Sequence, residues 1–357
     1  GVMLTNKNYR ALFIEAAQLD WAAYDEGDVV MNAMPLFHVA GCNLGVLASA
    51  QGAMTLVLRE IDPAKILELV EEHKVKHTFW VPAVILMLTQ QPNVRDVDFS
   101  ALQNVSYGAS PIAEDLLKTA VEIMGCNFHQ LYGLSETIGA GACLPPSAHD
   151  PAKGKLRACG LPWAGAEVRT VDGDGKPTGP GEVGEICIKA PFVMKGYWNR
   201  PEATEEAIRD GWFHTGDIVY QATDGMLHFV DRLKNIIRRS GENIAAVEVE
   251  GVLQECSEVE QVAVIAVADP IREEEVMACI VLKSGNTPDL HLAKKLFNYV
   301  NERLSYFKSP GWIKFLGSLP KTGSQKIQKH LIVSGTDGPE SGQLTFDLRD
   351  LKRRSKE

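Results

Sequence analysis

Residues 320–329 read PKTGSQKIQK, and three further glycine-containing blocks precede them in a fixed order. These blocks are YGLSET at 132–137, GWFHTGD at 211–217 and DRLKNIIRRSGENI at 231–244. Taken singly, each is typical of a turn, because glycine beside short polar residues is the usual composition of loops. Four such blocks in this order are far more specific than any one of them, and they decide the fold that we expect.

The segments between the blocks predict an α/β architecture, because helix-like and strand-like stretches alternate through the first half of the chain. Asp62 and Pro63 predict the start of one helix, as its N-cap and first helical residue. Ser110 and Pro111 predict the start of another, which Gly125 ends. The sequence therefore predicts strands connected by helical crossovers.

Changes in composition predict three parts. Residues 1–231 form a large domain, within which 159–231 are rich in strand and turn signals and predict a small β subdomain. Residues 232–334 predict a C-terminal α+β domain, with a helix candidate at 291–304 whose apolar residues repeat every fourth position. The polar, glycine-rich segment from 335 to 357 predicts a disordered tail.

The four blocks resemble those of the adenylate-forming superfamily, most closely its acyl-CoA synthetases, over residues 1 to about 334. In that family ATP and a carboxylic acid give an acyl-adenylate and pyrophosphate, and coenzyme A then displaces AMP to leave a thioester. The resemblance implies ATP, Mg²⁺ and coenzyme A as cofactors and co-substrates and a carboxylic acid as substrate. It also implies a large domain of β/α layers with a small β subdomain, followed by a mobile C-terminal lid.

One part of the family pattern is missing from this sequence. The phosphate loop of the family, rich in Ser, Thr, Gly and Lys, normally ends just before a segment like GVMLTNKN, with which this chain begins at Gly1. The resemblance therefore predicts a large domain truncated at its front. We expect the 357-residue chain alone to be inactive and prone to self-association, since unpaired sheet edges and exposed apolar surfaces associate.

The family assigns nucleotide contacts to residues of the YGLSET block and to a short segment before it. The resemblance implies that Thr137 holds the α-phosphate through its hydroxyl and that Glu136 binds Mg²⁺, which prefers oxygen ligands. Small residues let the backbone approach a purine. The implied adenine wall consists of Gly108, Ala109, Ser110, Tyr132 and Gly133.

The next two blocks supply the remaining nucleotide contacts and a hinge. Asp217 is a short acceptor after Gly216, suited to two ribose hydroxyls, and Arg232 resembles the second nucleotide contact of the family. Lys234 stands where the family places the hinge between the large domain and the lid.

The lid carries two segments that serve different steps. Lys326 resembles the lysine that stabilises negative charge during adenylate formation, and Gly241 the glycine beside the path of the coenzyme A thiol. One departure affects Lys326, because Gln325 precedes it where the family usually has glycine.

PLFHVAG at 35–41 places His38 beside small residues, and the family uses such a histidine as a gate at the mouth of the acyl pocket. A buried histidine bonded to backbone is the alternative interpretation. Trp80, Val81 and Pro82 are further pocket candidates, but their sizes leave the identity of the acid open.

Composition narrows the class of protein. The chain has 357 residues, 45% of them hydrophobic, and a formal charge of −10, which argues against a nucleic-acid partner. The seven cysteines are scattered and odd in number, so neither a disulfide framework nor a zinc site is indicated. We expect no membrane span and a cytoplasmic location. The sequence is compatible with a homo-oligomer.

The sequence therefore predicts an AMP-forming acyl-CoA synthetase, with fatty-acid metabolism as one setting. Two alternatives stay open. The first is an adenylation domain that passes its acyl group to a carrier protein. The second is a non-catalytic remnant that binds nucleotide or a partner, which Gln325 and the missing phosphate loop favour.

Overall fold

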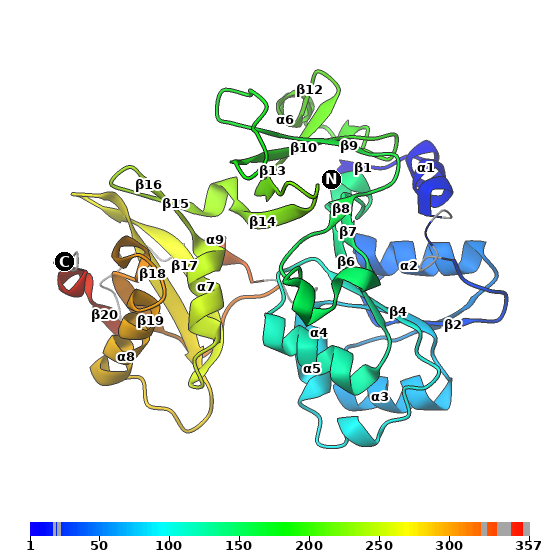
Figure 1. Cartoon of the computed structure of the whole chain (residues 1–357), viewed down its shortest axis with the longest axis horizontal. Helices are drawn as coiled ribbons and strands as arrows, with labels where there is room; N and C mark the ends of the chain where they lie inside the picture. The colour runs from blue at the N-terminus through cyan, green and yellow to red at the C-terminus, as the bar shows by residue number, and fades with distance from the viewer. Residues whose placement is uncertain (17–18, 20–22, 323–326, 334–343, 353–357) are drawn as a thin grey trace. The chain divides into compact units, whose positions relative to one another are not determined.

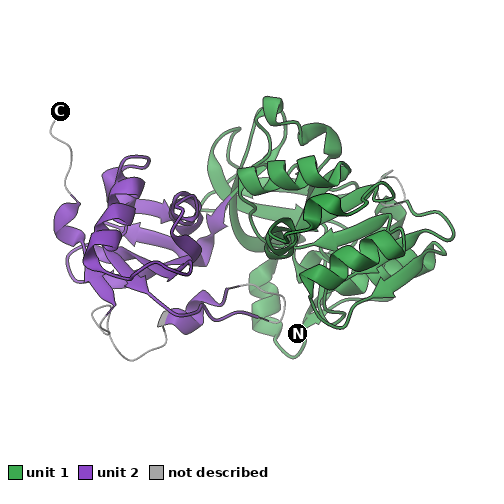
Figure 2. Cartoon of the chain, turned by 90° about the horizontal axis from the view of Figure 1, so that it is seen from below, with its two compact units in different colours: residues 1–229 green, residues 230–357 purple. Residues whose placement is uncertain are grey.

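The structure is a computed structural model that describes residues 1–16, 19, 23–322, 327–333 and 344–352 (Figure 1). The chain divides into two compact units, Gly1–Phe229 and Val230–Glu357 (Figure 2). The domain boundary that the sequence predicts follows residue 231, two residues beyond this division. Each unit is built on its own sheets.

The first unit contains a seven-stranded sheet. Its strands, in the order in which they lie, are β3 (Met54–Val57), β2 (Val29–Asn32), β4 (His77–Trp80), β5 (Asn104–Gly108), β6 (Asn127–Tyr132), β7 (Ala142–Leu144) and β8 (Leu161–Pro162). Neighbours from β3 to β6 are parallel, whereas β7 and β8 run antiparallel to the strands that they pair with. Parallel pairing requires helical crossovers, which explains the predicted alternation of helices and strands.

Helices cover both faces of this sheet. One face carries α2 (Val39–Ala50), and the other carries α3 (Pro63–Glu72), α4 (Pro82–Thr89) and α5 (Glu114–Met124) (Figure 1). The crossover from β2 to β3 moves one way across the sheet, and the crossovers from β3 to β4, β5 and β6 move the other way. Because each crossover is right-handed, this reversal places α2 on the opposite face from α3, α4 and α5. The described residues of this unit also form the 3-10 turns η2 (Val94–Asp96), η3 (Ser135–Thr137), η4 (Pro146–Ala148) and η5 (Pro151–Lys153).

Local signals correctly predicted two helix ends. Asp62 caps α3 by accepting a hydrogen bond from the Lys65 amide at 3.2 Å, and Pro63 is its first residue. Gly125 ends α5 in the left-handed conformation, with φ of 61°.

The predicted start of α5 is wrong. The helix begins at Glu114 after the N-cap Ala113, whereas Ser110 and Pro111 lie in the preceding loop. Ala109 has φ of 68°, so the chain turns sharply at the end of β5 before it can enter a helix.

The core of the first unit lies between the central strands and the helices. Trp80, Tyr107 and Phe128 come from β4, β5 and β6, and all three are fully buried. Every residue of β4 is buried, as expected of a strand that has helices on both faces.

Most of residues 159–231 form the β subdomain that the sequence predicts, but β8 at their start belongs to the seven-stranded sheet. A five-stranded sheet has the order β12 (Ile208–Arg209), β13 (Trp212–Gln221), β10 (Val183–Lys189) and β9 (Glu167–Val171), and β14 (Leu227–Arg232) also pairs with β13. A separate two-stranded ladder joins β1 (Val2–Met3) to β11 (Gly196–Tyr197). The helices of this region are α1 (Asn6–Ala16) and α6 (Pro201–Ala207).

The second unit is an α+β domain around a six-stranded sheet. Its strands lie in the order β16 (Glu242–Ala245), β15 (Ile236–Arg239), β18 (Glu273–Leu282), β19 (Trp312–Phe315) and β20 (Thr345–Asp347), and β17 (Val259–Asp269) also pairs with β18. The helices are α7 (Ala246–Gln254), α8 (Leu290–Asn301) and α9 (Lys329–Val333), with η6 (Leu233–Asn235), η7 (Tyr306–Lys308) and η8 (Arg349–Leu351) as 3-10 turns. In α8, Leu292, Leu296 and Val300 are buried, as their four-residue spacing predicts.

The prediction of a disordered tail from residue 335 is wrong for residues 344–352. Here β20 pairs with β19, and Leu348 after it is buried. Leu344, Phe346 and Leu348 alternate with polar residues, which is the period of a strand, but the glycine-rich stretch before them dominates the composition.

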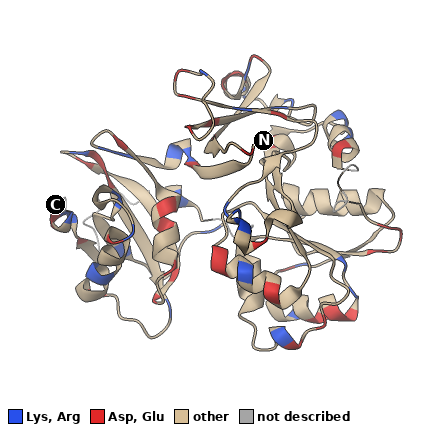
Figure 3. Cartoon of the chain, viewed as in Figure 1, with Lys and Arg blue, Asp and Glu red and all other residues tan. Residues whose placement is uncertain are grey.

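Neither surface charge nor cysteine chemistry marks out a special region in the described residues. Acidic and basic residues are interspersed over both units (Figure 3). All seven cysteines are free thiols. Within the described ranges, no helix combines the length and the hydropathy needed to cross a membrane.

Candidate active site

Four predicted site segments lie at one edge of the seven-stranded sheet. Strands β2, β4, β5 and β6 are adjacent and parallel, so their carboxyl ends lie at the same edge (Figure 1). His38 lies in the loop after β2, Trp80 ends β4, Gly108 ends β5 and Tyr132 ends β6. Open α/β sheets bind ligands outside the carboxyl ends of their strands, and this edge is therefore the candidate site.

The predicted adenine wall begins at the end of β5 with a close backbone approach. A Cβ on Gly108 would lie 2.1 Å from the carbonyl oxygen of Leu131, so only glycine fits between β5 and β6. The left-handed conformation of Ala109 costs on the order of 1 kcal/mol. Ser110 follows on the exposed surface. The backbone is thus both crowded and strained where it turns at this edge.

Tyr132 and Asp217, 85 residues apart, are brought into contact. The Tyr132 hydroxyl donates a hydrogen bond to Asp217 Oδ2 at 2.8 Å, and Asp217 is only 2% exposed. Burial, and then the charge and hydrogen bond of Asp217, raise the pKa of Tyr132 well above its usual value. Gly133 is equally constrained, since a Cβ there would lie 2.3 Å from the backbone of Gly139. The wall and the predicted ribose acceptor therefore form one cluster.

A bulge in β13 presents Asp217. Cys187 of β10 pairs with His214, and Glu185 pairs with Ile218, so residues 215–217 stand opposite one residue of β10. Bulges redirect side chains and are common beside active sites. The last three residues of the GWFHTGD block form this bulge.

Glu185 shapes the bulge, and the sequence did not single it out. Its Oε1 accepts a hydrogen bond from the Gly216 amide at 2.9 Å, and its Oε2 lies 2.8 Å from His214 Nδ1. Together with Cys187, these are side chains of the kind that bind zinc, but the Arg209 guanidinium stands 3.8 Å from Glu185. The arrangement supports the backbone before Asp217. In the sequence, Glu185 looks like any polar residue of an alternating strand.

Glu136 is half-buried and held in place. The Tyr197 hydroxyl donates to its Oε1 at 2.8 Å, and its carbonyl oxygen accepts from the Met194 amide at 2.7 Å. Burial and Glu136 raise the pKa of Tyr197, so the phenol stays a donor. Mg²⁺ is often bound by one or two carboxylates with phosphate oxygens and waters, and a single fixed carboxylate fits that pattern.

The structure does not support the predicted role of Thr137. Its side chain is fully buried, and its hydroxyl donates to the Leu134 carbonyl at 3.2 Å and accepts from the Leu134 amide at 3.1 Å. The hydroxyl therefore caps its own turn. Ser135, on the other side of Glu136, is half-buried, and its hydroxyl makes no hydrogen bond within the part of the chain that the structure describes. Of the two hydroxyls beside Glu136, that of Ser135 is therefore the more accessible.

His38 is the N-cap of α2 and is half-buried. Its Nδ1 accepts a hydrogen bond from the Ala40 amide at 3.2 Å. One turn further, Asn43 Nδ2 donates to the Ile138 carbonyl at 2.5 Å, which ties α2 to the residue after Thr137. His38 therefore lies on the helix that borders the candidate site and is more exposed than a core histidine.

The other predicted acyl-pocket residues belong to the core. Trp80, Val81 and Pro82 are all buried where β4 leads into α4. Their buried side chains pack under the site edge, and little of their surface is accessible to a ligand.

Three predicted residues lie in the second unit. Arg232 ends β14 and Lys234 lies in η6, and both are exposed. Asp231 is fully buried and accepts hydrogen bonds from the amides of Arg232 at 2.7 Å and Val247 at 2.9 Å. Gly241 has φ of 83° in the turn between β15 and β16. Asp231 thus fixes the backbone on which the predicted hinge begins.

Lys326 lies outside the described residues, as does Gln325 before it. On either side of this stretch, Lys321 and Ile327 form an isolated antiparallel bridge.

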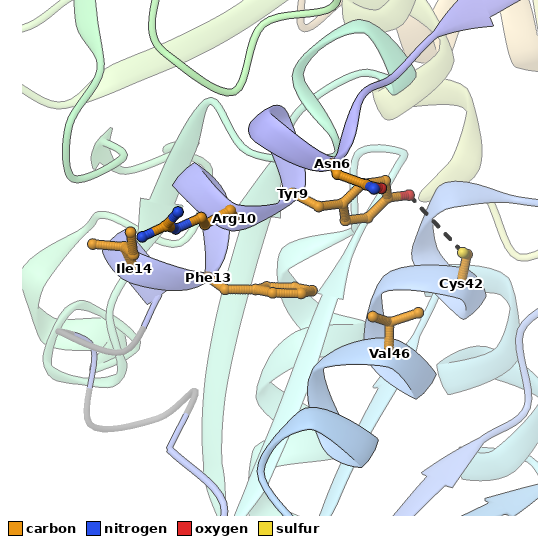
Figure 4. A pocket seen from close by; sticks show the side chains of 7 residues that line it. All are labelled: Asn6, Tyr9, Arg10, Phe13, Ile14, Cys42 and Val46. Atoms are coloured by element: carbon orange, nitrogen blue, oxygen red, sulfur yellow. Dashed lines mark hydrogen bonds between the residues drawn. The ribbon is translucent and has the colours of Figure 1, made fainter.

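An apolar groove of about 730 Å³ lies between α1 and α2 (Figure 4). The Tyr9 hydroxyl and the Cys42 sulfur, 3.9 Å apart, face each other across it. Its lining consists of Asn6, Tyr9, Arg10, Phe13, Ile14, Cys42 and Val46. The predicted site residues are not among these, so the groove is separate from the candidate site.

Two family models match the chain. Residues 1–198 match the AMP-binding enzyme family, and residues 248–326 match the AMP-binding enzyme C-terminal domain. The first match contains the edge of the seven-stranded sheet described above, and the second ends at Lys326.

Curated relatives include ligases with different thiol acceptors. A fatty acid–[acyl-carrier-protein] ligase, ScoC, of Streptomyces coeruleorubidus is 33% identical over 329 residues, covering 92% of this chain and 63% of the relative. A feruloyl-CoA synthase of an Amycolatopsis species is 37% identical over 330 residues, covering 92% of this chain and 65% of the relative. The chain thus spans less than two thirds of the length of these relatives.

Solved structures show the same fold with nucleotide bound. The o-succinylbenzoate-CoA synthetase MenE of Bacillus subtilis, in complex with an acyl-adenylate intermediate, has a TM-score of 0.84 and 28% identity, covering 95% of this chain and 67% of that one. Its complex with ATP and a magnesium ion has a TM-score of 0.81 and 29% identity, covering 92% and 66%.

Proposed function

Because the chain belongs to the adenylate-forming superfamily of AMP-binding enzymes, we propose that the whole protein activates a carboxylic acid with ATP and transfers the acyl group to coenzyme A. The observation that supports this most is the convergence of the loops after β2, β4, β5 and β6 at one sheet edge, with Asp217 bonded to Tyr132 there.

At that edge, the nucleotide lies against small residues and one buried carboxylate. Asp217 accepts hydrogen bonds from the ribose hydroxyls, and the Tyr132 phenol keeps its carboxylate oriented. The adenine packs against the close backbone of Gly108, Ala109 and Ser110 and of Tyr132 and Gly133.

The phosphates lie over the η3 turn. Ser135 donates to the α-phosphate, in place of the buried Thr137. Glu136 holds Mg²⁺, which neutralises phosphate charge when it is bound.

The acyl group enters beside α2. His38, half-buried at the start of this helix, borders the carboxylate end of the substrate.

The second unit serves both half-reactions by turning about Lys234. Lys326 stabilises the negative charge that develops during adenylate formation, and Arg232 contacts the nucleotide. After rotation, the turn at Gly241 borders the path of the coenzyme A thiol.

A carrier protein is the second candidate acceptor, favoured by the likeness to the acyl-carrier-protein ligase of Streptomyces coeruleorubidus. Both acceptors present the same kind of thiol, so the site at the sheet edge serves either reaction.

The test measures pyrophosphate release by the whole protein with a panel of aliphatic and aromatic acids, and then thioester formation with coenzyme A or with a carrier protein. We expect acid-dependent release that falls about 100-fold or more in Lys326→Ala, and a thioester of coenzyme A. Acylation of the carrier protein alone would favour the second candidate. Release that no acid raises above the Lys326→Ala level would contradict acid activation altogether.

A further inference from the structure

The last described residues, 344–352, lie beyond the part of the chain that matches the C-terminal domain model. They nevertheless belong to the sheet of the second unit, because β20 pairs antiparallel with β19. Phe346 packs against Phe315 with ring centroids 5.9 Å apart, and Leu348 is buried. We call residues 344–352 the C-terminal segment.

Lys352 brings a buried positive charge to the interior of the unit. Its ammonium group lies 2.5 Å from Glu275 Oε1 and donates to the Phe307 carbonyl at 3.0 Å. Glu275 is also fully buried and accepts from Arg239 Nε at 2.9 Å. Burying two cations against one carboxylate is costly unless the geometry is good, so this arrangement holds Lys352 and Arg239 in fixed positions.

Arg239 is the last residue of β15, directly before the turn at Ser240 and Gly241. The buried carboxylate of Glu275 therefore connects the C-terminal segment with one end of this turn.

Arg349 makes a second connection to the same turn. Its guanidinium lies 4.5 Å from the ring centroid of Trp312 and donates to Asp269 Oδ2 at 3.1 Å. The other oxygen of Asp269 accepts from the amides of Ile271 and Arg272, each at 3.0 Å. The Arg272 carbonyl in turn accepts from the Ser240 amide at 3.0 Å. Asp269 thus fixes the loop at Ile271 and Arg272, and this loop holds Ser240 at the start of the turn.

Near its base, the hairpin of β15 and β16 is anchored by Ile237 and Ile244, which are both fully buried in the core of the second unit. β15 pairs with β18 at a single position, Arg239 opposite Glu273. The Arg238 amide adds a hydrogen bond to Glu274 at 2.7 Å. The connections through Glu275 and Asp269 act at the other end of the hairpin, where Arg239 and Ser240 lead into the turn.

We propose that the C-terminal segment is a positioning element for the β15–β16 hairpin, acting through Lys352 and Arg349. This inference rests on the proposed function for its catalytic consequence, because Gly241 in that hairpin is the residue assigned to the thiol path. Loosening the segment leaves adenylate formation in place and impairs the transfer to the thiol. Lys352 and Arg349 act through other residues and touch no substrate.

Hydrogen exchange tests the positioning directly, since it measures local opening of backbone amides. The variants are Lys352→Met and Arg349→Met, with Lys294→Met as a control on the exposed face of α8. We expect amides of residues 236–245 to exchange at least tenfold faster in both variants, amides of β17 to change less than twofold, and Lys352→Arg to restore much of the protection. Unchanged exchange in the hairpin would overturn the proposal. An equal rise of exchange in β17 would also overturn it, because it would show only a loss of overall stability.

The half-reactions are then measured separately in Lys352→Met. We expect thioester formation from supplied acyl-adenylate to fall at least tenfold, with a raised KM for coenzyme A, while acid-dependent pyrophosphate release stays within threefold of the unsubstituted protein. A loosened hairpin with both half-reactions intact would contradict the role of Gly241 in the proposed function and leave the structural coupling standing. An equal loss of both half-reactions would count against the positioning role itself.

Discussion

A buried carboxylate beside a phenol is the central residue-level feature of the candidate site. Asp217 is almost inaccessible, and burying an ionised carboxylate is unfavourable unless hydrogen bonds compensate. The Tyr132 hydroxyl supplies such a bond at 2.8 Å, and the bulge built by Glu185 fixes the backbone before it. The acceptor is thus oriented before a ligand arrives, which lowers the entropic cost of binding.

Asp217→Ala is expected to weaken AMP binding by roughly 1.5–3 kcal/mol, the range for a hydrogen bond to a charged group, or roughly 10- to 150-fold in Kd. Isothermal titration calorimetry with AMP measures the change. Asp174→Ala, in an exposed turn of the same subdomain, is the matched control. Unchanged affinity in a folded Asp217→Ala protein would remove this residue from the site.

Substitution of Ser135 is expected to lower the rate of the reaction, whereas substitution of Thr137 is expected to lower the stability of the fold. Thr137→Val deletes a buried hydroxyl that bonds to Leu134, so the free energy of unfolding should fall by about 1 kcal/mol. Ser135→Ala should leave unfolding within about 0.5 kcal/mol of the parent and slow pyrophosphate release by the whole protein about 100-fold. Urea unfolding and a pyrophosphate assay on both variants test this. Slower release in Thr137→Val than in Ser135→Ala would restore Thr137 to the phosphate contact.

The sequence predicted individual site residues better than their contacts. Tyr132 and Asp217 were each recognisable from a motif, but their hydrogen bond depends on how β6 and β13 meet, 85 residues apart. The chemistry of Thr137 suits a phosphate contact, and only the structure shows that its hydroxyl is buried and bonded to Leu134. Glu185 carries no local signal, because its role exists only once β10 pairs with the bulge in β13.

At the scale of elements, the hairpin of β15 and β16 depends on two residues in left-handed conformations. Ser240 and Gly241 have φ of 50° and 83°, the pattern of the tight turn that suits the twist of two strands. A Cβ on Gly241 would meet no atom within 4 Å, so space does not restrict this position, whereas φ does.

Gly241→Leu is expected to block thioester formation while sparing adenylate formation, because its side chain would enter the thiol path. Gly241→Asn is the matched variant, since asparagine tolerates the left-handed conformation. The rates of the two half-reactions in the whole protein distinguish a blocked thiol path from backbone strain. If the asparagine variant is as active as the parent while the leucine variant is inactive in both steps, backbone strain explains the loss and the thiol path does not.

A chain of polar side chains connects strands of the seven-stranded sheet, and all its members are buried except the half-buried Asn104. His77 Nε2 lies 3.2 Å from Asp28 Oδ2, and its Nδ1 lies 3.1 Å from Asn104 Nδ2. Asn104 Oδ1 in turn lies 3.0 Å from His129 Nε2. The amide nitrogen can only donate, so His77 Nδ1 accepts and both imidazoles fit the network as neutral rings.

This network predicts a loss of stability in acid. Burial, followed by the charges of His149 and His77, lowers the pKa of His129 to about 3. The unfolded state therefore binds the proton first as pH falls below about 6.5, and stability present above that pH is lost progressively down to about pH 3. His129 alone should lower the free energy of unfolding by about 2 kcal/mol at pH 5 relative to pH 7.

The measurement is urea unfolding at pH 7 and pH 5 for the parent, His129→Gln and the exposed control His291→Gln. We expect the difference between the two pH values to shrink in His129→Gln and to persist in His291→Gln. Equal pH dependence in all three proteins would show that His129 titrates normally.

Elements were predictable where a signal lies within them. Asp62 with Pro63 marks the start of α3, and the four-residue spacing marks α8. The strand β20 was missed, because its short apolar alternation is convincing only beside β19, against which it packs. The start of α5 was missed because a left-handed Ala109 is not visible in sequence.

At the scale of the whole chain, both units expose apolar side chains, and on the first unit some of them lie on an edge strand and beside a groove. Among the described residues, the edge strand β3 pairs with β2 on one side only, and its Met54 and Val57 side chains are exposed. The groove between α1 and α2 adds Phe13, Ile14 and Val46 (Figure 4). Exposed edge strands and contiguous apolar surfaces are regular sites of association between chains.

The 357-residue chain is therefore expected to self-associate through the first unit. A lysine on an edge strand opposes pairing with a second chain, so Met54→Lys with Val57→Lys should shift the chain toward monomer at concentrations where the parent associates. Ile271→Lys removes a still more exposed apolar side chain from the second unit and should leave association unchanged. Sedimentation velocity over a concentration series measures all three proteins. A parent that stays monomeric throughout would contradict the expectation, and an equal effect of Ile271→Lys would show that added charge, and not the β3 edge, controls association.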